Sequence, residues 1–115
     1  MLKPTILGLL IVSTILVTQA QAAQRYGAIA SSRSGDWGVS TNYMSVSSAE
    51  REARRSCGDL NCSIRVLFRG CGAVAEHNRT LAWGVASTVV RARGQALRVL
   101  EGQGEILAEV CNRDS

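Results

Sequence analysis

A short pattern occurs twice in this chain of 115 residues and limits the folds open to it. "YGAIA" begins at Tyr26 and is followed by "WGV" at Trp37, while "CGAVA" begins at Cys71 and is followed by "WGV" at Trp83. The connecting segments, "SSRSGD" and "EHNRT", consist largely of turn-forming residues. Two short segments around a turn are typical of a β-hairpin, so we predict one hairpin in each copy.

A segment with helical periodicity follows each hairpin. Small or apolar residues recur there at i, i+4 and i+8 and predict helices near residues 47–57 and 90–101, with the buried stripes Ala49, Ala53, Cys57 and Ala92, Ala96, Leu100. Ser47 and Glu50 have capping-box spacing, and Gly58 and Gly102 stand where each helix should stop. Small residues on these stripes would let each helix lie close to a sheet.

One further strand closes each copy, with "SIRVLF" at residues 63–68 and "EILAEV" at residues 105–110. Each copy is therefore predicted to be a β-β-α-β unit. A single unit cannot bury both its sheet and its helix, whereas two units related by an approximate twofold axis can. We predict an α+β fold with duplicated β-β-α-β halves in one domain, residues 23–115, with copies at about 26–70 and 71–111.

The first 22 residues have the organisation of a signal peptide. Lys3 supplies a positive charge, residues 6–17 are apolar but short for a membrane span, and "AQA" places small residues before Ala23. We predict cleavage after Ala22, export to the periplasm or beyond, and no stable membrane anchor afterwards. An uncleaved N-terminal anchor is the alternative.

Arginine supplies every cation after Lys3, and the chain as a whole carries a formal charge of +4. Arginine forks match phosphates, so this composition is compatible with anion or nucleic-acid binding. The alternative is a bias in composition without functional meaning. Few aromatic residues accompany the arginines, and no stacking platform is evident. We therefore expect no nucleic-acid partner.

All four cysteines lie in the part predicted to be exported, and an even number in a small exported chain indicates two disulfides. Three pairings are possible. A zinc site needs clustered ligands, but Cys57 and Cys62 are separated by four residues and His77 is the single histidine. A thioredoxin-like redox site needs two intervening residues. We expect no metal and no cofactor.

The combination of "YGAIA", "WG", a helix ending in cysteine and "CGAVA" resembles a family of small exported bacterial proteins described as domain of unknown function DUF4189. The resemblance covers about residues 26–111. It implies a duplicated, disulfide-bonded α+β domain in periplasmic or secreted proteins, and it brings no activity, cofactor or catalytic residue. Similar members carry a cysteine pair at positions matching Leu100 and Glu105, which this chain lacks.

That missing pair supports one disulfide assignment, Cys57–Cys62 and Cys71–Cys111. Cys57 ends the first predicted helix and Cys62 precedes the next strand, with "GDLN" as the turn between them. Cys71 opens the second copy and Cys111 closes it. They approach each other if the last strand lies beside the second hairpin.

Few residues suggest chemistry. Glu76 and His77, placed in the second hairpin turn, could form a general base, although neighbours in a strand point apart and an exposed turn is the alternative. Asp36, Asp59 and Glu76 could supply a carboxylate pair only if folding joins two of them. The sequon "NRT" at residues 78–80 is most simply a chance match.

These observations favour a non-enzymatic exported protein that contacts another protein or a cell-envelope component, such as an inhibitor or immunity-type protein. The alternatives are a small hydrolase of envelope polymers and a secreted effector. If the surface carries a binding site, we expect it around the second hairpin turn and the two tryptophans, with the candidate residues Trp37, Trp83, Glu76, His77 and Arg79. Tryptophans buried in the core are the alternative.

Overall fold

The computed structural model describes residues 24–113, so the predicted signal peptide at residues 1–22 lies outside the described part. Within it the elements follow in the order β1 (Tyr26–Ser31), β2 (Trp37–Tyr43), α2 (Val46–Cys57), β3 (Ser63–Phe68), β4 (Cys71–His77), β5 (Thr80–Ala86), α3 (Val89–Val99) and β6 (Glu105–Cys111). Neither helix among these residues has the length and apolar character needed to cross a membrane.

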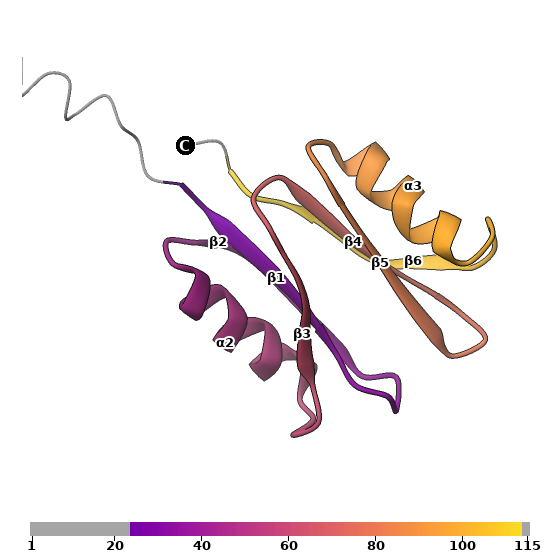
Figure 1. The fold of residues 1–115 in the computed structure, drawn as a ribbon, viewed down its shortest axis with the longest axis horizontal. Helices are drawn as coiled ribbons and strands as arrows, with labels where there is room; N and C mark the ends of the chain where they lie inside the picture. Colours follow the sequence, from indigo (N-terminus) through magenta and orange to yellow (C-terminus); the bar gives the residue numbers. More distant parts are fainter. Residues whose placement is uncertain (1–23, 114–115) are drawn as a thin grey trace, which may run out of the picture.

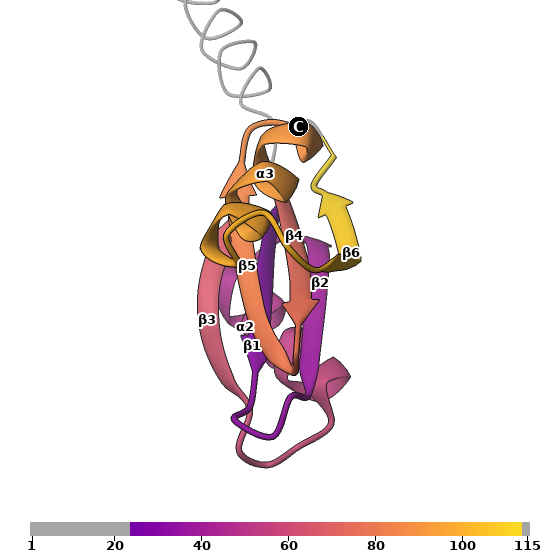
Figure 2. The same cartoon turned by 90° about the vertical axis from the view of Figure 1, so that its right-hand side faces the viewer.

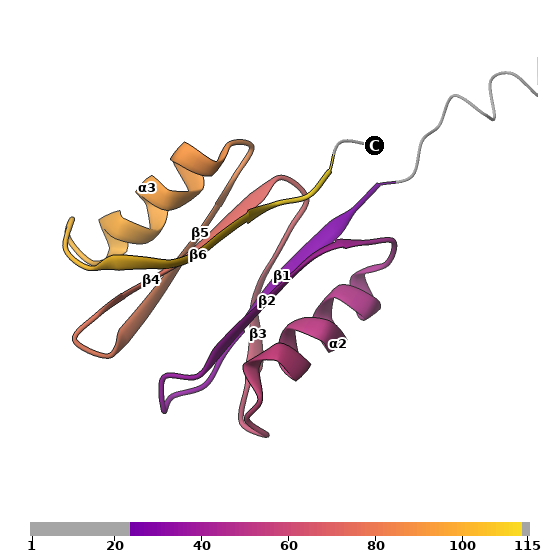
Figure 3. The same cartoon turned by 180° about the vertical axis from the view of Figure 1, so that it is seen from behind.

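The two predicted β-β-α-β units are both present. Strands β2-β1-β3 form one antiparallel sheet and strands β5-β4-β6 form the other. The sheets lie face to face, α2 covers the outer side of the first and α3 the outer side of the second (Figure 1). Seen from behind, the helices again lie outside the paired sheets (Figure 3). The predicted α+β fold with duplicated halves is confirmed.

Each helix lies close to its sheet because small residues line the contact. Ala49, Ala53, Ala92 and Ala96 are fully buried, as the stripes predict. On the facing strands, a Cβ on Gly38 would overlap the backbone of α2, and one on Gly84 would overlap the backbone of α3. The two glycines stand at matching positions of the repeat, so both copies rely on the same close approach.

The core between the sheets is built on Ile29, Phe68 and Val74. Trp37 and Trp83 pack against this core and are half-buried. The Phe68 ring lies over the glycines that begin the small "GAIA" and "GAVA" segments, and a Cβ on Gly72 would be 2.9 Å from it. Gly72 and Val74 alternate toward the same inter-sheet face, which Phe68 fills.

Two helix boundaries differ from the prediction. Ser45 caps α2 by accepting a 3.2 Å hydrogen bond from the Ser48 N–H, so Ser47 and Glu50 do not form the predicted capping box. The reason is that the extended conformation required of a cap occurs at Ser45, before the helix begins. Gly58 ends α2 in the left-handed conformation as expected.

The second helix ends earlier than residue 101. Its C-cap is Leu100, and Glu101 and Gly102 both have positive φ. The Gly102 N–H donates to the Leu97 carbonyl over 2.8 Å. Gly102 therefore completes the turn that ends the helix, two residues beyond the cap, rather than marking the last helical residue.

The disulfides join Cys57 to Cys62 and Cys71 to Cys111, the pairing expected from the sequence. Cys71 and Cys111 are direct neighbours across β4 and β6.

Strand register also corrects one residue correspondence between the two halves of the repeat. Ser63 matches Glu105, because they pair with the matching positions Ser31 and Glu76. The residues that precede them, Cys62 and Gly104, therefore correspond to each other, and the prediction that Glu105 matches a cysteine position is wrong.

Candidate functional site

The sheets meet along two seams that differ in character. Edge strand β3 contacts β5 on one side of the sandwich, and edge strand β2 contacts β6 on the other. Figure 2 shows β3 on the left of the molecule and β2 and β6 toward the right. We call these the β3/β5 seam and the β2/β6 seam. The candidate site lies on the first.

Two adjoining hollows open at one end of the β3/β5 seam. One, of about 550 Å³, is lined by Arg33, Ser34, Asn61, Ser63 and Arg65. The other, of about 300 Å³, shares Arg33 and Arg65 and adds Arg79 and Trp83 from the second half. We call the set Arg33, Arg65, Arg79 and Trp83 the arginine hollow. Both halves of the repeat contribute to it.

Local backbone geometry explains how these arginines are placed. Arg33 lies in the turn between β1 and β2. Arg65 is the extra residue of a β-bulge, because Ile29 pairs with Val66 while the next residue, Ala30, pairs with Ile64. Bulges redirect the side chain they carry and are common at sheet edges.

Arg79 is placed by a tight turn. Asn78 and Arg79 connect β4 to β5 with φ values of 50° and 67°. Two consecutive residues with positive φ are typical of the two-residue turn that matches the twist of a hairpin. Glu76 and His77 are therefore the last residues of β4, and the prediction that they lie in the turn is wrong.

The Arg65 side chain is held in a defined position. Its Nε donates to Ser31 Oγ over 2.8 Å, and its Nη2 donates to the Ser31 carbonyl over 3.2 Å. The guanidinium carbon lies 5.8 Å from the centroid of the Trp83 ring, within the range of a cation–π contact. Trp83 and Ser31 thus orient the guanidinium, and its remaining N–H groups are available to a ligand.

The arginines of the hollow form no ion pair within the described residues. The ion pairs among residues 24–113 are Arg55 with Glu52 and Arg93 with Glu109. Arg33, Arg65 and Arg79 are exposed and take part in neither. Arginines that converge without an acidic partner attract anions and select those with oxygens in the geometry of a carboxylate or phosphate.

Two of the three candidate carboxylates do come together beside the hollow. Ser34 Oγ lies 3.1 Å from Asp59 Oδ2 and 3.4 Å from Asp36 Oδ2, whereas Glu76 lies on β4. The backbone N–H of Asn61 lowers the pKa of Asp59, and the side chains of Asp36 and Ser34 add to this effect. A general acid needs the opposite shift. The pair links two loops, and Asp59 does not have the raised pKa of a general acid.

The other sequence candidates do not meet. His77 Nε2 lies 3.3 Å from the Asn78 side-chain amide. Glu76 and His77 are adjacent in a strand and so point to opposite faces, which separates the base from its carboxylate. Trp37 lies on the other edge strand, β2. Of the five candidates, Arg79 and Trp83 line the hollow.

Sequence reasoning missed Arg33 and Arg65. The available signal for Arg65 was its position in the strand segment "SIRVLF", where the matching residue of the second copy is Leu107. Aligning the two copies would have shown that Arg65 replaces an apolar residue, and such a difference can mark a functional position. Among the described residues no three His, Cys, Asp or Glu side chains cluster as metal ligands would.

Comparisons with known proteins agree with this fold. Protein Rv1269c of Mycobacterium tuberculosis is 43% identical over 93 residues, which cover 81% of this chain and 74% of that protein. Uncharacterized protein Rv1813c of the same organism is 37% identical over 87 residues, which cover 76% of this chain and 60% of that protein. The NMR structure of Rv1813c matches with a TM-score of 0.66 at 34% identity, covering 80% of this chain and 78% of the solved one.

The match to the family extends over the whole repeat. The profile described as "Domain of unknown function (DUF4189)" aligns with residues 26–111, from the first residue of β1 to the last residue of β6. The two sheets, both helices and both disulfides lie within this range. The chain belongs to the DUF4189 family.

Proposed function

We propose that the protein is a non-enzymatic binding module that works outside the cytoplasm and contacts another macromolecule through the arginine hollow. The partner is a protein or a component of the cell envelope. One observation carries the proposal: arginines from both halves of the repeat converge beside Trp83 without an acidic partner among residues 24–113. A site that needs both halves also gives the duplication a use beyond completing the core.

The location rests on the disulfides and on the N-terminal sequence. All four cysteines are joined in pairs. Disulfides persist in oxidising compartments and are rare in the cytoplasm. The basic and then apolar sequence before Ala23 agrees with export to the periplasm or the medium.

A binding role accounts for the site better than the alternative of an envelope hydrolase. The cysteines are occupied in disulfides, so none of them is a nucleophile. The lowered pKa of Asp59, set mainly by the Asn61 N–H, favours a permanent carboxylate over a proton donor. A small disulfide-bonded module with an arginine-lined face is also compatible with an inhibitor or immunity-type protein.

A charge-matched comparison of variants tests the proposal. Arg65→Gln combined with Arg79→Gln removes two charges from the hollow, while Arg51→Gln combined with Arg54→Gln removes two from the exposed side of α2. Each purified protein is immobilised and exposed to periplasmic and envelope extracts, and captured material is quantified. We expect the first variant to lose most of the capture seen with the unchanged protein and the second to retain it.

Equal capture by both variants would refute the proposal, because net charge rather than the hollow would then govern binding. Thermal unfolding of each variant shows whether its fold is intact. Arg65→Lys serves as a further variant, since it keeps the charge but loses the planar fork that matches carboxylates.

A further inference from the structure

We infer that the partner is a protein and that it binds as an extended acidic segment laid along β3, in the β3/β5 seam. The inference rests on the proposed function and specifies the partner of the same site. It follows from three properties of the seam: an open strand edge, arginines at both ends of that edge, and an exposed apolar surface.

The open edge belongs to β3. Within residues 24–113 this strand has β1 as its neighbour on one side and no strand on the other. Such an edge presents backbone N–H and C=O groups that another chain can pair with. On β5, across the seam, the Val85 N–H is already bonded to Gln95 Oε1 of α3 over 3.0 Å. An incoming strand would have to displace this bond on β5.

Arginines stand at both ends of this edge. Because the bulge at Arg65 interrupts the alternation of the strand, Arg65 lies on the inter-sheet side of the edge, while Arg69 lies on the side that faces α2. Arg33 and Arg79 reinforce the end at Arg65. At the other end the Arg69 guanidinium carbon lies 5.8 Å from the Tyr26 ring, which positions it. An added strand with a carboxylate on each of its faces would therefore meet an arginine on both sides of this edge.

The surface between the arginines is apolar. A hollow of about 380 Å³ is lined by Leu67, Phe68 and Arg69 from the first half and by Val85 and Ala86 from the second. Leu67 is 39% exposed in this hollow. An apolar side chain on the same face of an added strand would cover it.

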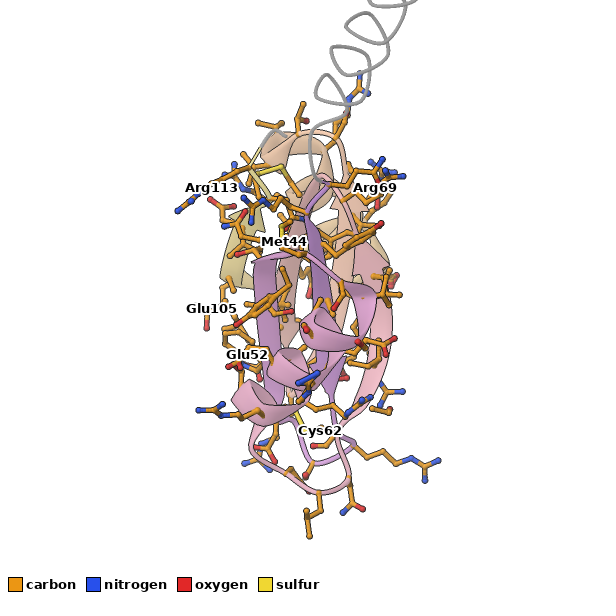
Figure 4. All side chains as sticks on the ribbon, turned by 90° about the vertical axis from the view of Figure 1, so that its left-hand side faces the viewer. Met44, Glu52, Cys62, Arg69, Glu105 and Arg113 are labelled. Carbon is orange, nitrogen blue, oxygen red and sulfur yellow. A yellow bond between two sulfur atoms is a disulfide. The ribbon has the colours of Figure 1, made fainter. Side chains whose placement is uncertain are left out.

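The β2/β6 seam shows what the same fold looks like when closed. There Asn112 Oδ1 accepts from the Asn42 N–H over 2.7 Å, and Asn42 Oδ1 accepts from the Arg113 N–H over 2.7 Å. The counterpart of Arg65 is Leu107, which packs against the core between the sheets. Figure 4 places Arg69 on one side of the molecule and Glu105 and Arg113 on the other. One seam is clamped while its counterpart remains open and basic.

A polypeptide suits the open seam better than an anionic polysaccharide or polyphosphate. All of these supply negative charge. A peptide strand alone supplies alternating N–H and C=O groups at the spacing of the β3 edge and apolar side chains to cover Leu67. The unpaired edge of β3 and the exposed Leu67 side chain therefore favour a protein partner.

Labelled peptides test this directly. The probe is a ten-residue peptide in which pairs of Glu alternate with pairs of Val, so that each face of the strand carries both residue types. It is compared with a second peptide in which Gln replaces Glu and a third with N-methylated amides on alternate residues. Linear polyphosphate serves as a polyanion without a peptide backbone. Binding is measured by fluorescence anisotropy, and amide hydrogen exchange is followed by NMR.

We expect the Glu peptide to bind at least tenfold more tightly than the Gln and N-methylated peptides. Arg65→Gln with Arg79→Gln should weaken it at least tenfold, Arg51→Gln with Arg54→Gln should not, and exchange should slow at β3 amides around Leu67. Polyphosphate binding as tightly, or no effect of N-methylation, would overturn the protein partner. If envelope capture still depends on Arg65 and Arg79 in that case, the proposed function stands. If it does not, both fall.

Discussion

The two halves of this protein have the same secondary structure but differ in the contacts that link their elements. Where the first half has the Cys57–Cys62 disulfide, the second has Leu100 packed against Gly104. Where the second half has Cys71–Cys111, the first has the matching positions Tyr26 and Arg69 in a cation–π contact. Each half therefore has one disulfide, and the two disulfides are at different positions of the repeat.

The comparison separates positions that maintain the fold from positions that differentiate the surface. The alanine stripes and the glycines Gly38 and Gly84 are the same in both halves, because each helix must approach its sheet equally closely. The bulge is also the same, yet it carries Arg65 in one half and Leu107 in the other. Duplication therefore supplied two seams, of which one closes the sandwich and the other presents arginine.

The largest expected effect is on the free energy of unfolding, to which the two disulfides should contribute unequally. The chain-entropy model assigns about 4 kcal/mol to the Cys71–Cys111 link, with a sequence separation of 40, and about 2 kcal/mol to the Cys57–Cys62 link, with a separation of 5. Replacing both cysteines of one link by alanine should lower the free energy of unfolding by roughly these amounts. Urea titration of the two double variants measures them.

Equal losses would contradict this ranking and show that residual structure in the unfolded state, rather than loop length, sets the effect. Reduction of the unchanged protein provides the control, since it opens both links without altering the sequence.

The glycines that admit the helices should come next. Gly38→Ala and Gly84→Ala each force a methyl group into the helix backbone, so both should destabilise by about 1–3 kcal/mol. Gly94 is the matched control, because the nearest atom to an added Cβ is Arg98 Nη2 at 3.8 Å. Gly94→Ala should stabilise by about 1 kcal/mol, the difference in helix propensity. A large difference between Gly38→Ala and Gly84→Ala would break the equivalence of the halves.

The sequence sufficed to predict the parts that the repeat defines. Two hairpins, two helices with buried alanine stripes and the closing strands follow from periodicity that appears twice, so each copy supports the interpretation of the other. Caps were less predictable. Ser45, Ser47 and Ser48 are all suitable N-caps in one short run, and only backbone conformation distinguishes them.

The candidate site was harder to predict, because it joins residues far apart in the chain. Arg79 and Trp83 were accessible from the hairpin pattern. Arg33 and Arg65 come from a turn and a bulge in the other half, and nothing local places them beside Trp83. A bulge leaves little trace in the sequence, since one extra residue shifts the alternation without changing composition.

The smallest predicted effect concerns the ion pair between Arg93 of α3 and Glu109 of β6. Arg93 Nε lies 2.8 Å from Glu109 Oε2, and this hydrogen bond is the main cause that lowers the pKa of Glu109 below its ordinary value of 4.5. A carboxyl whose pKa falls on folding stabilises the protein above the unfolded pKa and loses that contribution as the pH drops through the folded one. Arg93→Gln should therefore slightly reduce the urea midpoint near pH 7, since the pair is well exposed. The difference from the unchanged protein should shrink below pH 4.5 as Glu109 becomes protonated. Arg98→Gln, on the same helix and outside both ion pairs, should show no such pH dependence. If the two variants behaved alike from pH 7 to pH 3, the Arg93–Glu109 pair would make no measurable contribution to stability.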